Sequence, residues 1–206
     1  MPPPRLYERP FYKIGRYSFQ FPWVTALQNN LTAAVNNLRR VGQRRPAMRS
    51  ETECIEHTLA EALRTRGFQV VVGYQPQTNG DLDAGEVDLL CHLDGFVLLI
   101  EVKSGFIRST QHEVWLHRTN TLRKAARQLK RKRPAVLQAL LFDQVLRSEL
   151  GMRDKDRPTN LHSWVVDTSV EFDGDRVDEF KVVSREVLEV VLRDEKHCLI
   201  PPDQQK

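Results

Sequence analysis

The clearest pattern of hydrophobic and polar positions lies in Gly85–Lys103, which reads GEVDLLCHLDGFVLLIEVK. Its two apolar runs, Glu86–His92 and Phe96–Lys103, predict two short strands. Asp94 and Gly95 separate them, and an Asp-Gly pair between apolar runs is a strong hairpin signal, because Gly adopts positive φ without strain. The pattern therefore predicts an antiparallel β-hairpin centred on this turn.

Counting outward from the turn fixes which residues of the hairpin are opposed. The pairs are Leu93 with Phe96, Leu90 with Leu99, Asp88 with Glu101, and Glu86 with Lys103. Because strand side chains alternate between the faces of a sheet, the four charged residues share one face. The opposite face is apolar (Val87, Leu89, Ile100 and Val102), and the charged face is partly so (Leu90, Val97 and Leu99). A strand that is apolar on both faces is a central strand.

Asp88 and Glu101 are thus predicted to be two opposed carboxylates in buried strands. Like charges directly opposed destabilise a sheet, and buried charges must be paired or bound to a metal. A divalent cation resolves the conflict, since Mg²⁺ is commonly held by one or two carboxylates together with substrate phosphate oxygens. Lys103 would lie beside that ion and its bound water, which suits phosphodiester hydrolysis. The alternative is a solvated face on which the two acids only keep the hairpin soluble.

The same residues resemble a known family. Asp88, followed by Glu101-Val102-Lys103 at the end of the next strand, resembles the core signature of the PD-(D/E)XK nuclease superfamily. The fuller pattern GEVDLL…DGFVLLIEVKSG resembles its nuclease-related (NERD) and archaeal Holliday-junction resolvase branches, although Gly-Glu-Val stands where the superfamily's name has Pro. The resemblance implies Mg²⁺, with Mn²⁺ as a substitute, held by Asp88, Glu101 and the Val102 carbonyl. It also implies that Lys103 orients the attacking water.

Two further residues match the resembling families. Ser50 and Glu53 have the spacing of a capping box and predict a helix that ends at Gly67. Glu56 is the one acid on the buried edge of this helix, where the families have a Glu that points into the active site and holds a metal or its water. The alternative is a Glu that reaches solvent. Gln128 matches a family Gln that reaches toward the site from the helix after the hairpin.

A run of basic residues follows the hairpin on a helix predicted to begin at Thr121. The run consists of Arg123, Lys124, Arg127, Lys130, Arg131 and Lys132, with no acid between Arg118 and Arg133. Solvated helices ordinarily mix charges, because like charges one turn apart repel. The first five of these residues are therefore predicted to contact nucleic-acid phosphates, which gives salt-dependent affinity without sequence preference. The alternative is a solvated basic face.

Several other elements follow from apolar patterning. Further strands are predicted over Phe68–Tyr74, Val114–Arg118, Leu161–Val166 and Phe180–Val183, with Trp115 in the core, and a short strand near Tyr17–Phe21. Helices are predicted over Pro22–Arg40 and from Ser184 through Arg193, and Pro134 should kink or restart the basic helix. The apolar residues of Val136–Leu146 are either buried or a dimer face. Asp81 and Asp83 are an alternative metal pair, but their polar loop gives them no fixed geometry.

Composition sets broad limits. The chain has 206 residues, 40% of them hydrophobic and 28% charged, which is ordinary for a soluble globular protein. A net charge of +4 permits a polyanionic partner. The three cysteines, Cys54, Cys91 and Cys198, lack metal-ligand spacing and read as reduced thiols, which favours the cytoplasm. No apolar run approaches the roughly 20 residues of a membrane span, so no membrane partner is expected.

The predicted fold is an α+β restriction-endonuclease-like sandwich over residues 47–206, with a mixed central sheet flanked by helices. Residues 1–46 are expected to form an N-terminal aromatic and basic arm and a helix, an N-terminal helical extension. The predicted function is a metal-dependent endonuclease that hydrolyses phosphodiester bonds of DNA, as a monomer or a homodimer. Two alternatives stay open: a non-cleaving nucleic-acid-binding module on the same fold, and a protein-interaction domain of a larger DNA-processing protein.

Overall fold

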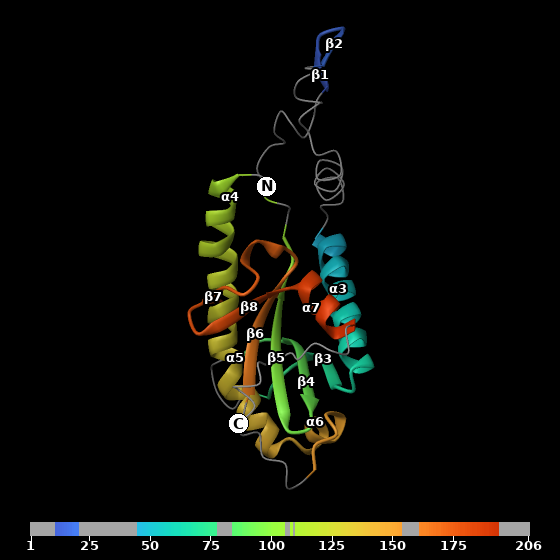
Figure 1. Ribbon diagram of the computed structural model, residues 1–206, viewed down its shortest axis with the longest axis vertical. Helices are drawn as coiled ribbons and strands as arrows, with labels where there is room; N and C mark the ends of the chain where they lie inside the picture. The colour runs from blue at the N-terminus through green and yellow to red at the C-terminus, as the bar shows by residue number, and fades with distance from the viewer. Residues whose placement is uncertain are drawn as a thin grey trace. The chain divides into compact units, whose positions relative to one another are not determined.

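The computed structural model describes residues 11–20, 45–77, 84–105, 108, 110–153 and 161–193 (Figure 1). The chain divides into two compact units, residues 1–50 and 51–206. In the first unit, β1 (Phe11–Ile14) pairs antiparallel with β2 (Tyr17–Gln20). The predicted strand near Tyr17 is confirmed, and Phe11, Ile14, Tyr17 and Phe19 are exposed. The predicted helix over Pro22–Arg40 and the alternative metal pair Asp81 and Asp83 lie outside the described residues.

The second unit is built on a mixed six-stranded sheet in the order β3-β4-β5-β6-β8-β7. The strands are β3 (Gln69–Tyr74), β4 (Val87–Leu93), β5 (Phe96–Lys103), β6 (Leu161–Asp167), β7 (Arg176–Val177) and β8 (Phe180–Ser184). β3, β4 and β5 are antiparallel neighbours, β5, β6 and β8 run parallel, and β7 closes the edge antiparallel to β8. The predicted α+β fold with a mixed central sheet flanked by helices is confirmed.

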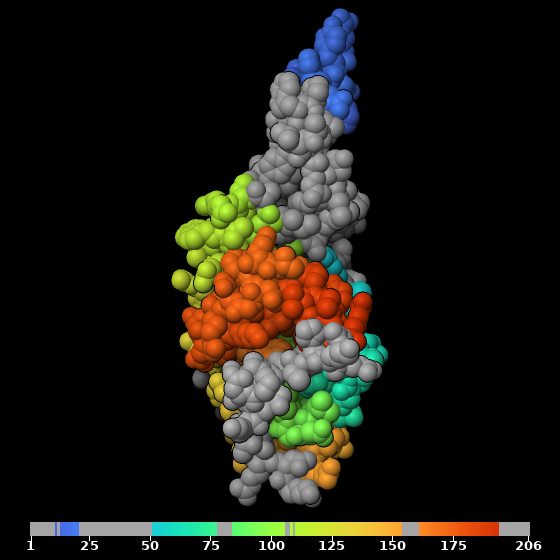
Figure 2. Space-filling view, viewed as in Figure 1, coloured from blue at the N-terminus to red at the C-terminus, as the bar shows by residue number. Residues whose placement is uncertain are grey.

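Helices cover both faces of this sheet (Figure 1). One face carries a helical segment made of α4 (Gln111–Leu116), the π-helical η2 (His117–Leu122) and α5 (Arg123–Phe142), followed by α6 (Gln144–Glu149). The other carries α3 (Arg45–Thr65) and α7 (Arg185–Arg193). A short 3₁₀ turn, η3 (Val170–Phe172), follows β6, and the space-filling view shows η3, β7, β8 and α7 as one continuous surface (Figure 2). Among the described residues, no helix has the length and apolar character needed to cross a membrane.

The apolar core lies in two layers, one on each face of the sheet. Leu90, Leu99 and Val165 pack with α5 residues, and Leu98, Ile100 and Val166 pack with α3 and α7 residues. β5 is buried on both faces, as expected for a central strand. Each fully buried aliphatic side chain contributes about 1.5–3 kcal/mol, so the hairpin is held firmly between the two layers.

The predicted hairpin is confirmed, together with its register near the turn. Leu93 pairs with Phe96 and Leu90 with Leu99. Asp94 and Gly95 both have positive φ, 47° and 83°, as a two-residue hairpin turn requires. The strands predicted at Phe68–Tyr74, Leu161–Val166 and Phe180–Val183 are also confirmed within one or two residues. Ser184 caps α7 as predicted, since its hydroxyl accepts from Val187 N at 3.1 Å.

The prediction of a strand over Val114–Arg118 is wrong, because this segment is helical in α4 and η2. Thr110 caps the helix by accepting from Glu113 N at 3.3 Å, and this local bond outweighs the strand propensity of Val114 and Trp115. Trp115 is 58% exposed and not in the core.

Two other predicted helix boundaries are corrected. Ser50 lies inside α3 and does not cap it, because the helix is already formed at Arg45 with Pro46 in its first turn, where Pro is tolerated. α5 continues through Pro134 and ends before Asp143, whose carboxylate caps α6 by accepting from Val145 N and Leu146 N, both at 3.0 Å.

One expectation about burial is corrected, and another is met in part. Val87 packs on the α5 side of the sheet and not with Leu89, so the simple alternation of β4 fails at its first residue. The apolar segment predicted as buried or as a dimer face is mixed, because Val136, Leu140 and Leu146 are buried while Leu141, Phe142 and Val145 are exposed.

Candidate functional site

The candidate site begins where the β4–β5 ladder ends. The last ladder pair is Leu89 with Ile100, so Asp88 does not join the backbone pairing with Glu101 that was predicted. Instead the Asp88 carboxylate reaches across to β5, where its Oδ2 accepts from Val102 N at 2.7 Å. This bond satisfies the backbone N–H of Val102 and fixes Oδ2 of Asp88, while Oδ1 contacts a different group.

Asp88 and Glu101 meet at a lysine from α5. The Lys132 ammonium lies 3.2 Å from Asp88 Oδ1 and also bonds Glu101 Oε2. The side chain of Lys132 is only 3% exposed and that of Glu101 only 1%. The two carboxylates predicted to lie close together therefore do so, and a single cationic nitrogen bridges them.

Lys103 completes the cluster from the same strand as Glu101. Its Nζ lies 2.5 Å from Glu101 Oε1, and its side chain is 20% exposed. The predicted neighbourhood of Asp88, Glu101 and Lys103 is thus present in the structure. Two carboxylates are balanced by two ammonium groups in a largely buried setting, which is the condition for burying charge at a tolerable free energy.

Burial and mutual repulsion shape the ionisation of the acids. Burial, and then the negative charge of Glu101, raise the pKa of Asp88, while Lys132 and Lys103 oppose that shift. Glu56, half-buried on α3, has its pKa raised to about 7, first by burial and then by the negative charges of Asp88 and other nearby acids. Glu56 therefore shares the electrostatic field of the site, and at neutral pH it is poised between its acid and its base form.

Gln128 lies on α5 one helical turn before Lys132, so the two side chains project from the same side of the helix. Its Oε1 is buried and has no hydrogen-bond partner within the described residues. A buried acceptor without a donor marks a place for a water, an ion or a substrate group.

These residues fit a hard cation of the Mg²⁺ type. One oxygen of Asp88 and one of Glu101 converge on a single positive centre, and Mg²⁺ is often bound by only one or two carboxylates plus waters and phosphate oxygens. Over the described ranges, no group of three or more His, Cys, Asp or Glu side chains is arranged to hold a metal. A Mg²⁺ site at Asp88 and Glu101 stays a prediction, as do the contributions of Glu56 and the Val102 carbonyl.

The basic residues of α5 divide between its two sides. The five predicted phosphate contacts, Arg123, Lys124, Arg127, Lys130 and Arg131, are all exposed, whereas Lys132 faces the sheet with the apolar stripe. Lys130 lies 3.3 Å from Asp178, and Arg131 Nε donates to Ala84 O at 3.2 Å, next to the segment that enters β4. The exposed basic residues and the buried Lys132 therefore lie on different sides of α5, and Arg131 reaches the segment that enters β4.

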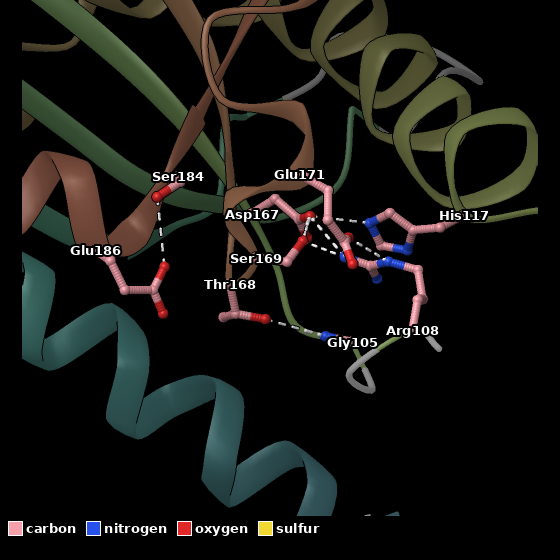
Figure 3. Close-up of polar contacts among 9 residues, drawn as sticks. All are labelled: Gly105, Arg108, His117, Asp167, Thr168, Ser169, Glu171, Ser184 and Glu186. Carbon is pink, nitrogen blue, oxygen red and sulfur yellow. Dashed lines mark hydrogen bonds and ion pairs between the residues drawn. The ribbon is translucent and has the colours of Figure 1, made fainter. Parts of the chain in front are cut away.

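A second polar cluster adjoins the site at the end of β6 (Figure 3). Asp167 is fully buried and is the Cα partner of Lys103. Its Oδ2 lies 3.0 Å from His117 Nε2 and 3.5 Å from an Arg108 nitrogen, and it accepts from the Ser169 hydroxyl. Arg108 also pairs with Glu171. Sequence patterning did not single out this cluster, although an acid directly after the apolar run of β6 was a signal for it.

Comparison with protein-family models, with curated proteins and with solved structures finds no match to this chain.

Proposed function

We propose that this chain is a Mg²⁺-dependent nuclease that hydrolyses phosphodiester bonds of DNA with Asp88, Glu101 and Lys103. The observation that carries the proposal is the convergence of one oxygen from each carboxylate on a single cationic centre, with a second amine bonded to Glu101. The mixed sheet flanked by helices and the Asp88…Glu101-Val102-Lys103 pattern, which resembles the PD-(D/E)XK nucleases, give further support.

Asp88 and Glu101 would hold the ion, with the Val102 carbonyl as the family resemblance implies. When bound, Mg²⁺ polarises the scissile phosphate and lowers the pKa of a coordinated water. The bond from Val102 N keeps Asp88 Oδ2 in place, so that Oδ1 is presented in a constant direction. A ligand held by a backbone bond in a central strand loses little entropy when the ion arrives.

Lys103 would stabilise the negative charge that builds on the phosphate during hydrolysis and orient the attacking water. Its ammonium is fixed by Glu101 yet is partly exposed, so it can reach a substrate group. Preorganised charges of this kind give a large share of enzymatic rate enhancement. Glu56, with its pKa near 7, would accept or release a proton beside the site, and Gln128 Oε1 would accept from a water.

The test is cleavage of labelled DNA by the wild-type protein and by the Glu101→Gln and Lys103→Met variants, with Mg²⁺ or Mn²⁺. Each variant is expected to lose about 10²-fold or more in rate, the usual cost of removing one transition-state contact. Glu179→Gln, at an exposed position between β7 and β8, is the matched control and should cleave like wild type. Absence of wild-type cleavage with either ion, or equal rates in all variants, would disprove the proposal.

One observation favours a second candidate, a non-cleaving nucleic-acid-binding module. Lys132 and Lys103 already balance both carboxylates, so the cluster is neutral without a metal. DNA binding that persists in EDTA, with no product formed in Mg²⁺ or Mn²⁺, would establish this alternative.

A further inference from the structure

We propose that Lys132 competes with the metal ion for the oxygens of Asp88 and Glu101, and thereby sets the metal affinity of the site. The inference rests on the metal site of the proposed function. It assigns a role to Lys132, the one residue of the basic run on α5 that was not predicted to contact phosphates.

The competition follows from position. Lys132 Nζ contacts Asp88 Oδ1 and Glu101 Oε2, one oxygen of each carboxylate. The other two oxygens have their own donors, because Val102 N bonds Asp88 Oδ2 and Lys103 Nζ bonds Glu101 Oε1. The pair of oxygens left for an ion is the same pair that the Lys132 ammonium occupies.

An ion and the ammonium cannot share this place. A Mg²⁺ ion lies about 2.0–2.1 Å from its oxygen ligands, which is shorter than the N···O distance of a hydrogen bond. An ion bound to both oxygens would therefore lie in contact with Lys132 Nζ. Both centres are positive, and their repulsion is strong in a site where Lys132 and Glu101 are almost completely buried. Metal entry therefore requires the Lys132 head group to move away.

The lysine side chain is suited to such a movement. Its flexible four-carbon stem carries a compact point charge, so the head group can swing out while α5 stays packed through Leu129 and Val136. The site then has two states, one closed by the ammonium and one open to the ion. The metal affinity of the site therefore includes the free energy of displacing Lys132.

The first experiment measures Mn²⁺ binding to the full chain without DNA, by calorimetry or by the electron-spin resonance of free Mn²⁺. Lys132→Met and Lys132→Gln, which remove the charge and keep much of the stem, should bind Mn²⁺ at least tenfold more tightly than wild type. Lys181→Met removes the same charge from an exposed position over Trp164 and should leave the affinity within twofold of wild type.

The outcomes separate this inference from the proposed function. Equal or weaker Mn²⁺ binding by both Lys132 variants, with wild type binding the ion, would overturn the inference alone. Tight binding by the variants and none by wild type would support the inference and contradict metal-dependent cleavage by the natural chain. Absence of binding in every protein would overturn both.

A second experiment needs no variant, and so it decides the question even where a Lys132 variant fails to fold. Amine-labelling reagents followed by mass spectrometry report whether each lysine head group is accessible. Lys132 should be protected in EDTA and become labelled several-fold faster at saturating Mg²⁺, whereas the rate at Lys181 should not change. Unchanged protection of Lys132 in the metal-loaded protein would overturn the inference.

Discussion

At the scale of single residues, the position of a charged side chain on its helix decides whether it is exposed or buried with a partner. Lys130 and Lys132 are two positions apart in a run without acids, yet Lys130 is exposed and Lys132 is almost completely buried between two carboxylates. Their difference follows from helical geometry, since Lys132 lies three residues after Leu129 and four before Val136, both on the buried stripe. A charge on an apolar stripe is a sign of a buried partner.

Glu56 provides a pH-dependent prediction at this scale. Its pKa rises from 4.5 to about 7 on folding, chiefly because of burial. Between these values the folded state holds a proton that the unfolded state has lost, so Glu56 makes the free energy of unfolding fall as pH rises from about 4.5 to about 7. Glu56→Gln should weaken this decrease and be more stable than wild type at pH 8.

Urea unfolding at pH 5 and pH 8, in EDTA so that no ion contributes, measures this effect. Glu61→Gln, on the exposed side of the same helix, is the control and should keep the wild-type dependence on pH. If Glu56→Gln and Glu61→Gln behave alike, then Glu56 does not carry a raised pKa.

The residues of the candidate site differ in how far the sequence could reveal them. Counting from a recognisable turn predicted Asp88, Glu101 and Lys103 as neighbours, but it failed for the backbone register, because the ladder ends at Leu89 and Ile100 and Asp88 meets Glu101 only through side-chain contacts. Lys132 and Asp167 were not found, because each acquires its role from elements distant in sequence; Lys132 lies 31 residues beyond Glu101. The details that decide chemistry, such as which oxygen meets which nitrogen, depend on the packing of α5 against the sheet.

At the scale of elements, a local hydrogen bond explains why one segment is helical although its apolar pattern predicted a strand. The segment Val114–Arg118 contains residues typical of strands, but the Thr110-x-x-Glu113 spacing before it is that of a helix start. The helix that results includes the π-helical η2, which carries His117 to Asp167. A π-helical segment widens one turn of a helix and is often found at functional sites.

Thr110→Ala tests the importance of this cap. Loss of the bond to Glu113 N should lower the free energy of unfolding by about 1 kcal/mol, the usual value of an N-cap hydroxyl. Thr58→Ala is a matched control, because its hydroxyl bonds a carbonyl inside α3 and no cap is lost. Chemical denaturation measures both, and equal effects would mean that Thr110 does not define the start of α4.

At the scale of the whole second unit, the strand order explains how one site gathers residues from separate segments. β5 lies between its hairpin partner β4 and its parallel neighbour β6, so Asp88, Glu101 and Asp167 reach the same end of the sheet. A parallel pair needs a long connection, and here that connection is the helical segment that supplies His117 and Lys132. The apolar residues on both faces of the hairpin predicted helices on both sides of the sheet, because a central strand with two apolar faces must be covered on each side.

Arg123, Lys124 and Arg127 are exposed on α5, and this gives a prediction about binding. If these residues hold the DNA backbone, replacing all three by Ala should weaken DNA binding. It should also reduce the slope of log affinity against log salt by about 0.9 for each lost phosphate contact, or by about 2.7 in total. Titrations at several salt concentrations, in EDTA to prevent cleavage, measure the slope.

The control removes an equal charge from another part of the same unit. Arg176, Lys181 and Arg193 are exposed on β7, β8 and α7, and their triple Ala variant should shift the slope much less. Similar slopes for the two triple variants would show that binding responds to net charge alone. A selective effect of the α5 variant would instead mean that the DNA backbone lies along the exposed residues of α5, since the two variants remove equal charge.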